Sequence, residues 1–184
     1  DVAGKGMPAA LLMAKLSSEV RFSFAAADSA ADGMNRLNAG FRRSDWEDRF
    51  VTIVIAVLDP ATHELTVVNG GHMAPYLRKA DGTLQLIGED EKGMPLGIVA
   101  DMRYEQATIK LVPGDVVTIF TDGITEAMNS ANQLYGFARL QERIAGAKGT
   151  ADAVGKTILD DVNRFVGTRA QSDDRCLVCL GRTK

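Results

Sequence analysis

Acidic residues beside predicted strand ends and glycine-bearing loops are the part of this sequence best suited to chemistry. Asp1 precedes the loop at residues 2–7, Asp122 follows an apolar strand in Thr121-Asp-Gly123, and Asp173-Asp174 precedes the last predicted strand. A carboxylate at the end of a buried strand is held in place yet reaches solvent, which suits an oxygen-ligated cation such as Mg²⁺ or Mn²⁺. These three places, far apart in the chain, could converge on one metal site. Each aspartate by itself is more typical of a turn or a helix cap than of a metal ligand.

The elements that must position these residues are two early helices, a series of strands and late helices. Apolar residues recur at helical spacing from Met7 to about Ala27, and a second helix follows Asp28 or Ser29 and includes Phe41. A charged break covers residues 42–49. Strands are predicted at about 50–58, 64–69, 74–78, 84–87, 104–111, 116–120 and 175–180, and further helices at about 125–129, 136–144 and 150–165. Short turns between strands imply antiparallel pairing, and the order favours an α+β fold with sheet against sheet and helices outside.

Two of these strands are apolar at both alternating positions. Residues 50–58 and 116–120 contain mostly Val, Ile, Ala, Leu and Phe on either parity. This pattern is typical of a strand that is covered on both faces. We therefore predict that both are buried and that the strand at 50–58 is central in its sheet.

Composition excludes several classes of protein. The chain has 184 residues, which is typical of one domain, and 21 Lys and Arg against 24 Asp and Glu give a net charge of -3. No bulk positive field exists to attract nucleic acid. No apolar run approaches the roughly 20 residues that a membrane helix needs, and no signal peptide opens the sequence. With only Cys176 and Cys179 present, we expect a cytoplasmic protein without membrane insertion or a disulfide framework.

Seven motifs across the chain resemble those of the bacterial PP2C-type serine phosphatases of the SpoIIE and RsbU kind. They are Asp1-Val-Ala-Gly-Lys-Gly-Met-Pro-Ala-Ala10, Phe50-Val-Thr52, Asn69-Gly-Gly-His72, Pro95-Leu-Gly97, Pro113-Gly-Asp115, Thr121-Asp-Gly-Ile-Thr-Glu-Ala127 and Asp173-Asp174. The resemblance implies an αββα sandwich, with two antiparallel sheets flanked by helix pairs and a two-metal centre at one edge. It also implies that residues 1–184 form a single phosphatase domain.

The resemblance assigns roles to individual residues. Asp1 matches the aspartate that bridges the two metal ions, and the Val2 backbone carbonyl matches a neighbouring ligand. Asp122 and Asp173 match further metal ligands, while Asp174 is the second member of its pair. The implied reaction is hydrolysis of a phosphoserine or phosphothreonine monoester by water that Mn²⁺ or Mg²⁺ activates.

The family also carries a metal-binding aspartate on a strand upstream of the motif at Asp1. Nothing precedes Asp1 in this sequence. We therefore expect a phosphatase domain truncated at its N-terminus, which binds metal poorly unless that strand is supplied. A sensor, receiver or coiled-coil region upstream is expected to control the first two helices.

Several further residues leave alternatives open. His72 is either a metal ligand or general acid, or a structural residue that is hydrogen-bonded at a turn. The structural role is favoured, because hydrogen-bonded polar groups often hold turns. Glu126, four residues after Asp122, is either a group supporting the metal ligands or a carboxylate near a helix start. Cys176 and Cys179 are predicted to point to opposite faces of the last strand and to fill the core.

Two main functions remain as hypotheses, besides a metal-dependent small-molecule phosphatase on the same fold, for which nothing in the sequence defines a pocket. The first is a metal-dependent protein serine/threonine phosphatase, the output domain of a signalling protein, whose implied substrate is a phosphorylated anti-anti-sigma factor of the STAS type. The alternative is a catalytically inactive PP2C-like domain that binds a partner or regulates it. The apolar stripes of the first two helices are compatible with a homodimer interface and with ordinary core packing.

Overall fold

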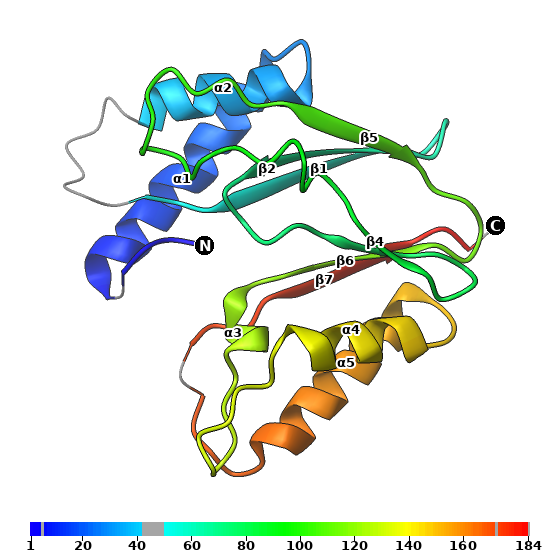
Figure 1. Cartoon of the computed structure of the whole chain (residues 1–184). Coiled ribbons are helices and arrows are strands. Elements are labelled where there is room, and N and C mark those ends of the chain that lie inside the picture. The colour runs from blue at the N-terminus through cyan, green and yellow to red at the C-terminus, as the bar shows by residue number, and fades with distance from the viewer. Residues whose placement is uncertain (5, 42–49, 172, 184) are drawn as a thin grey trace. The chain divides into compact units, whose positions relative to one another are not determined.

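The computed structural model describes residues 1–4, 6–41, 50–171 and 173–183, so the predicted charged break at 42–49 lies outside the described residues. The chain divides into two compact units (Figure 1). The first unit comprises Asp1–Ala74 and Gly88–Lys110, and the second comprises Pro75–Ile87 and Leu111–Lys184. Each unit has its own antiparallel sheet and its own pair of longer helices.

The first unit is built on a three-stranded sheet. Its strands are β1 (Ile53–Asp59), β2 (Glu64–Gly70) and β5 (Gln106–Lys110), in the order β1-β2-β5. Both pairs are antiparallel. The turn between β1 and β2 forms because the Asp59 carboxylate accepts the Ala61 N–H at 2.8 Å, which is common for aspartate in turns. The helices α1 (Met7–Ala25) and α2 (Ala30–Phe41) lie on one face of this sheet (Figure 1).

The two helices of the first unit pack closely on each other. Ser29 starts α2, because its Oγ accepts the Asp32 N–H at 3.1 Å. Gly33 allows the close approach, since a β-carbon there would lie 2.7 Å from the Phe24 ring. The core beneath the helices consists of Leu12, Leu16, Met34, Leu37, Phe41, Val51, Val68, Leu96 and Tyr104.

The second unit is built on a four-stranded sheet. Its strands are β3 (Tyr76–Arg78), β4 (Leu84–Leu86), β6 (Val116–Phe120) and β7 (Leu177–Gly181), in the order β4-β3-β6-β7 and antiparallel throughout. A short helix, α3 (Asp122–Thr125), follows β6 directly.

Helices α4 (Phe137–Gly146) and α5 (Ala151–Val166) lie together on one face of the four-stranded sheet (Figure 1). Thr150 caps α5, with its side chain accepting the Ala153 N–H. The apolar side chains that α4 and α5 turn inward are fully buried: Leu140, Ile144, Val154, Ile158 and Val162.

The predicted mixture of two antiparallel sheets and helices is confirmed, and most predicted elements are present within a few residues. The strand at 116–120 is an inner strand with almost every residue buried, as predicted. The prediction for residues 50–58 was wrong. In the described part of the chain β1 pairs only with β2, so it is an edge strand, and Val57 and Leu58 are 48% and 46% exposed. The apolar pattern reflects only which residue types occur along the strand. It does not determine how many strands pair with it.

None of the described helices combines the length and the apolar character needed to cross a membrane.

Candidate functional site

The first unit holds Asp1 and Val2 through main-chain pairing. The Asp1 nitrogen donates to the Thr52 carbonyl at 2.7 Å, and the Thr52 N–H donates to the Asp1 carbonyl at 2.9 Å. The Ala3 N–H donates to the Phe50 carbonyl at 3.0 Å. Val51 in turn exchanges two main-chain hydrogen bonds with Leu96. Residues 1–3 therefore run antiparallel to residues 50–52, and the Asp1 side chain is exposed.

His72 lies next to this pairing and is 7% exposed. Its Nδ1 lies 2.8 Å from the Thr52 hydroxyl, and its backbone N–H donates to Asn69 Oδ1 at 2.8 Å. These contacts favour the interpretation of His72 as a hydrogen-bonded structural residue. They also link the His72 turn to the residue that pairs with Asp1.

In the second unit, Asp122 is positioned by the end of β6. The strand stops at Phe120, Thr121 is extended, and Asp122 is the first residue of α3. The main chain thus changes from strand to helix within two residues. Asp122 is half-buried, which keeps its carboxylate close to the rigid strand and within reach of solvent.

One threonine joins the Asp122 segment to the Asp173-Asp174 segment. The Thr121 hydroxyl donates to the Asp174 carbonyl at 3.1 Å and accepts the Cys176 N–H at 2.9 Å. The Thr121 N–H also donates to the Cys176 carbonyl at 3.1 Å. We call these three contacts the Thr121 bridge. They bring Asp122 and Asp174 into neighbouring segments although the two residues are far apart in the sequence.

Glycine at position 123 permits this approach. A β-carbon there would overlap the Asp174 carbonyl group, with its carbon atom only 2.8 Å away. Real β-carbons do not come so close to main-chain atoms. The glycine that follows Asp122 is therefore required by the neighbouring segment.

Asp173 and Asp174 are both exposed, in the loop before β7. The Asp173 carboxylate accepts the Asp174 N–H at 2.9 Å, and the Asp173 carbonyl accepts a hydrogen bond from the Gln171 side chain at 2.8 Å. Glu126 caps the C-terminal end of α3 with its N–H donating to the Asp122 carbonyl at 2.7 Å. Its exposed carboxylate thus stands at the C-terminal end of α3, so the expectation of a helix-start carboxylate was wrong.

The loop after α3 is fastened by a residue that the sequence analysis missed. Arg169 donates from Nη1 to the Asn129 carbonyl at 2.7 Å and to Asn132 Oδ1 at 2.6 Å. Arg169 stands between α5 and Asp173, so it ties the loop after Asp122 to the segment that leads to Asp173. A lone arginine beyond a helix end gives no sequence signal for such a contact. Thr121 was part of a recognised motif, but its role became clear only from its partners.

The structure thus brings together the segments of Asp122, Asp173 and Asp174 in the second unit, while Asp1 and Val2 belong to the first. Among the described residues, no three His, Cys, Asp or Glu side chains gather closely enough to hold a metal ion. The predicted donors are nevertheless carboxylates and one carbonyl, and such an oxygen set fits Mg²⁺ or Mn²⁺.

The cysteines do not fill the core as predicted. Cys176 is exposed, and Cys179 is partly buried with its sulfur 3.8 Å from the Thr118 hydroxyl. Burial raises the pKa of the Cys179 thiol.

Comparison with known proteins places the sequence in a family. The family described as Stage II sporulation protein E (SpoIIE) matches residues 1–183. The phosphoserine phosphatase RsbU of Bacillus subtilis is 30% identical over 127 residues, which cover 68% of this chain and 37% of RsbU. Protein IcfG of Synechocystis is 25% identical over 138 residues, covering 72% of this chain and 21% of IcfG. The matched residues therefore cover well under half the length of each of these relatives.

Solved structures show the same fold at lower sequence identity. The SiaA-PP2C domain of Pseudomonas aeruginosa matches with a TM-score of 0.82 and 18% identity, covering 98% of this chain and 73% of that one. The structure of the RsbU and RsbW domains of Rv1364c from Mycobacterium tuberculosis matches with a TM-score of 0.74 and 21% identity, covering 100% and 50%. The chain belongs to the SpoIIE family, and its fold is that of the PP2C-type phosphatase domains.

Proposed function

We propose that this chain is a single phosphatase domain that hydrolyses phosphoserine or phosphothreonine monoesters of a protein with the help of Mn²⁺ or Mg²⁺. The observation that carries the proposal is the family match, which extends over residues 1–183. The relative RsbU is named a phosphoserine phosphatase, which supports the same activity here.

Asp1, the Val2 carbonyl oxygen, Asp122 and Asp173 are the proposed metal ligands, with Asp174 and Glu126 as supporting groups. The donor set is entirely oxygen, as hard divalent cations require. When bound, two such ions lower the pKa of water and neutralise charge on the phosphoryl group. The relative RsbX has been solved in complex with magnesium, which is consistent with this chemistry.

The residues around the proposed ligands fix their positions before a substrate binds. The Thr121 bridge keeps the Asp122 and Asp174 segments together through a side chain and two backbone groups. The pairing of residues 1–3 with residues 50–52 holds the Asp1 and Val2 backbone. Such preorganisation is what allows carboxylates to hold ions without a large rearrangement during the reaction.

The proposed substrate is a phosphorylated STAS-type protein, and the proposed regulator is a further domain of the same signalling protein. The match to the SpoIIE phosphatase domain solved with a fragment of its regulatory domain supports the second part. A homodimer through α1 and α2 is also proposed. Exposed apolar side chains on α1 support it: Met7, Leu11 and Phe22 are 72%, 54% and 79% exposed.

The test is hydrolysis of a phosphoserine peptide by this chain, measured as released phosphate with added Mn²⁺ and with EDTA. We expect release only with the metal, and a loss of at least about 100-fold in rate for Asp122→Asn, because an amide is a much weaker ligand than a carboxylate. Asp90→Asn, at an exposed aspartate that is not among the proposed ligands, serves as the matched control and is expected to keep the wild-type rate.

Three results would overturn the proposal: no release at any metal concentration even after an upstream strand of a relative is fused to the chain, release that EDTA does not affect, or an unchanged rate for Asp122→Asn. If the chain remains inactive when an upstream strand of a relative is fused to it, the inactive binding domain becomes the better description.

A further inference from the structure

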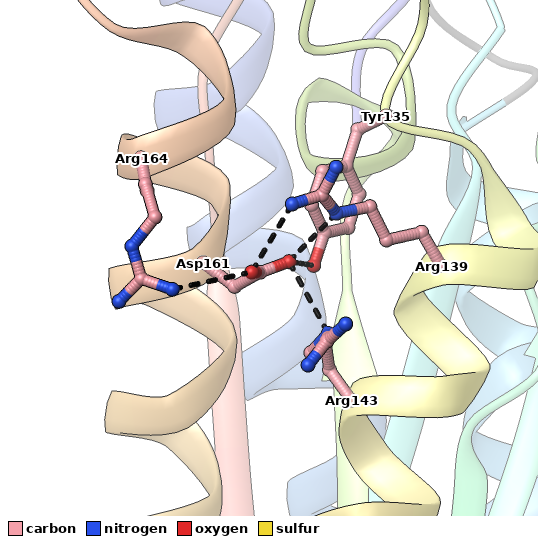
Figure 2. Close-up of polar contacts among 5 residues, drawn as sticks. All are labelled: Tyr135, Arg139, Arg143, Asp161 and Arg164. Atoms are coloured by element: carbon pink, nitrogen blue, oxygen red, sulfur yellow. Dashed lines mark hydrogen bonds and ion pairs between the residues drawn. The ribbon is translucent and has the colours of Figure 1, made fainter.

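One carboxylate between α4 and α5 attracts three arginines (Figure 2). Asp161, on α5, is 5% exposed. Its oxygens lie 2.8 Å from Arg139 Nε, 3.4 Å from Arg143 Nε and 3.9 Å from Arg164 Nη1. Tyr135, just before α4, donates its hydroxyl to the same carboxylate at 2.9 Å. Three guanidiniums against one carboxylate leave an excess of positive charge at this place, in a chain whose net charge is -3.

Among the described residues, Arg139 makes two of the three hydrogen bonds that the Asp161 carboxylate accepts, and Tyr135 makes the third. Arg139 donates from Nε and Nη2 to the two oxygens of Asp161, at 2.8 and 3.2 Å. Its guanidinium also lies over the rings of Tyr135 and Phe165, at 5.2 and 4.8 Å from their centres. The hydrogen bonds from Arg139 are the main reason why the pKa of Asp161 is lowered. Arg139 and Asp161 therefore form a complete structural pair between the helices.

Arg143 and Arg164 differ from Arg139 because their guanidinium N–H groups are available as hydrogen-bond donors. Within the part of the chain that the structure describes, neither side chain donates a hydrogen bond, although each is within ion-pair distance of Asp161. The Nε of Arg143 is buried without a hydrogen-bond partner, because its N–H is not directed at the nearby carboxylate. The two side chains are 43% and 77% exposed.

Two additional cations beside a neutralised ion pair repel each other and Arg139. Their charge is offset when an anion binds to them. Each guanidinium presents several N–H groups in a rigid fork, and a phosphate has enough acceptor oxygens for two such forks. A single carboxylate has only two oxygens and is matched by one fork. The chemistry of this place therefore favours phosphate.

We propose that Arg143 and Arg164 bind a phosphate group beside Asp161, either as the free ion or as a phosphoserine side chain. The site lies on α4 and α5 and uses none of the residues proposed to bind metal. It is therefore independent of the proposed phosphatase activity, and the two proposals can fail separately.

The experiment is a titration of the isotope-labelled full chain with sodium phosphate in EDTA at constant ionic strength, followed by amide chemical shifts. A second arm uses a phosphoserine peptide, so that the two arms separate the free ion from the phosphorylated side chain. We expect saturable shifts in α4 and α5 of the wild type. Arg143→Gln combined with Arg164→Gln should weaken binding roughly tenfold or more, because charged hydrogen bonds are lost.

The matched control removes two positive charges elsewhere in the second unit, by Lys148→Gln combined with Lys156→Gln, both at exposed lysines. It is expected to bind like the wild type and to melt at the same temperature. If the arginine double variant melts lower, Arg164→Gln alone is used, since its largely exposed side chain is not needed for packing. The proposal is overturned if phosphate and peptide cause no saturable shifts, if the arginine variants bind like the wild type, or if the lysine control loses as much affinity.

Discussion

The proposed metal ligands of the two units are held by different kinds of interaction. In the first unit, Asp1 and Val2 are positioned by main-chain hydrogen bonds to residues 50–52. In the second unit, hydrogen bonds of the Thr121 side chain join the segments of Asp122 and Asp174. Gly123 allows the two segments to lie this close, because it has no β-carbon. Main-chain pairing tolerates many side chains, whereas the second arrangement depends on two particular residues. The second arrangement should therefore be far more sensitive to substitution.

The strongest test of this difference is Gly123→Ala. The added methyl group overlaps the Asp174 carbonyl, so the loop before β7 must move. We expect a loss of about 3 kcal/mol or more in the free energy of unfolding, because such overpacking has no flexible side chain to absorb it. Chemical denaturation measures the loss. Gly146→Ala is the control, since a β-carbon there meets nothing within 4 Å; equal stability of the two variants would contradict the argument.

Asp161→Asn tests whether the helices of the second unit also depend on one particular side chain for their stability. Removing one partner of a buried ion pair leaves the arginines uncompensated, and we expect a loss of about 3 kcal/mol at pH 7. The hydrogen bonds from Arg139 lower the pKa of Asp161 below its usual 3.8, so the wild type is stabilised above about pH 4. That stabilisation is lost as the pH falls through the lowered value.

The difference in stability between wild type and Asp161→Asn should therefore be constant near neutrality and shrink below about pH 4. Denaturation curves between pH 2.5 and 7, spaced at roughly half a unit, measure it. Asp160→Asn, at the exposed neighbouring residue, is expected to show little change. A gap for Asp161→Asn that stays constant down to the lowest pH would rule out the lowered pKa.

Thr121→Val removes the hydroxyl of the Thr121 bridge and keeps the shape of the side chain. Two hydrogen bonds are lost, and the Cys176 N–H is left without its acceptor, so we expect about 2 kcal/mol of destabilisation. Thr121→Ser restores the hydroxyl and should recover most of the stability. If the serine variant is no better than the valine variant, the hydroxyl is not what joins the two segments.

The smallest effect is expected in the first unit, for Thr52→Val. The hydroxyl contact with His72 is lost, but the main-chain pairing with Asp1 remains. We expect about 1 kcal/mol or less, measured by the same denaturation assay. A loss larger than that of Thr121→Val would reverse the comparison between the two units.

Much of the fold could be predicted from the sequence, because periodicity and turn residues act locally. The helix stripes, the Thr150 cap and the Asp59 turn all depend on residues within a few positions of each other. The strands at 50–58 and 116–120 show the limit of this reasoning. Both are apolar on both parities, yet β6 lies inside its sheet and β1 lies at an edge. Strand order depends on long-range pairing that no local pattern contains.

The candidate site divides in the same way. The aspartates were identified from the sequence because a strand end beside glycine is a local feature. The contacts that hold them were not, because Thr121 reaches Asp174 and Cys176 more than 50 positions away. The Arg169 contacts with Asn129 and Asn132 likewise join residues that are separated in the sequence by both α4 and α5.

The two cysteines differ in exposure, so a fluorescent label can be attached selectively to one of them, close to the proposed ligands of the second unit. Cys176 is exposed and lies two residues after Asp174, with its N–H donating to the Thr121 hydroxyl. Cys179 is partly buried, and burial raises the pKa of its thiol, so that less of it is the reactive thiolate. A maleimide dye will therefore label Cys176 first, at the end of the Thr121 bridge. Fluorescence from that position follows the loop before β7 without any engineered cysteine.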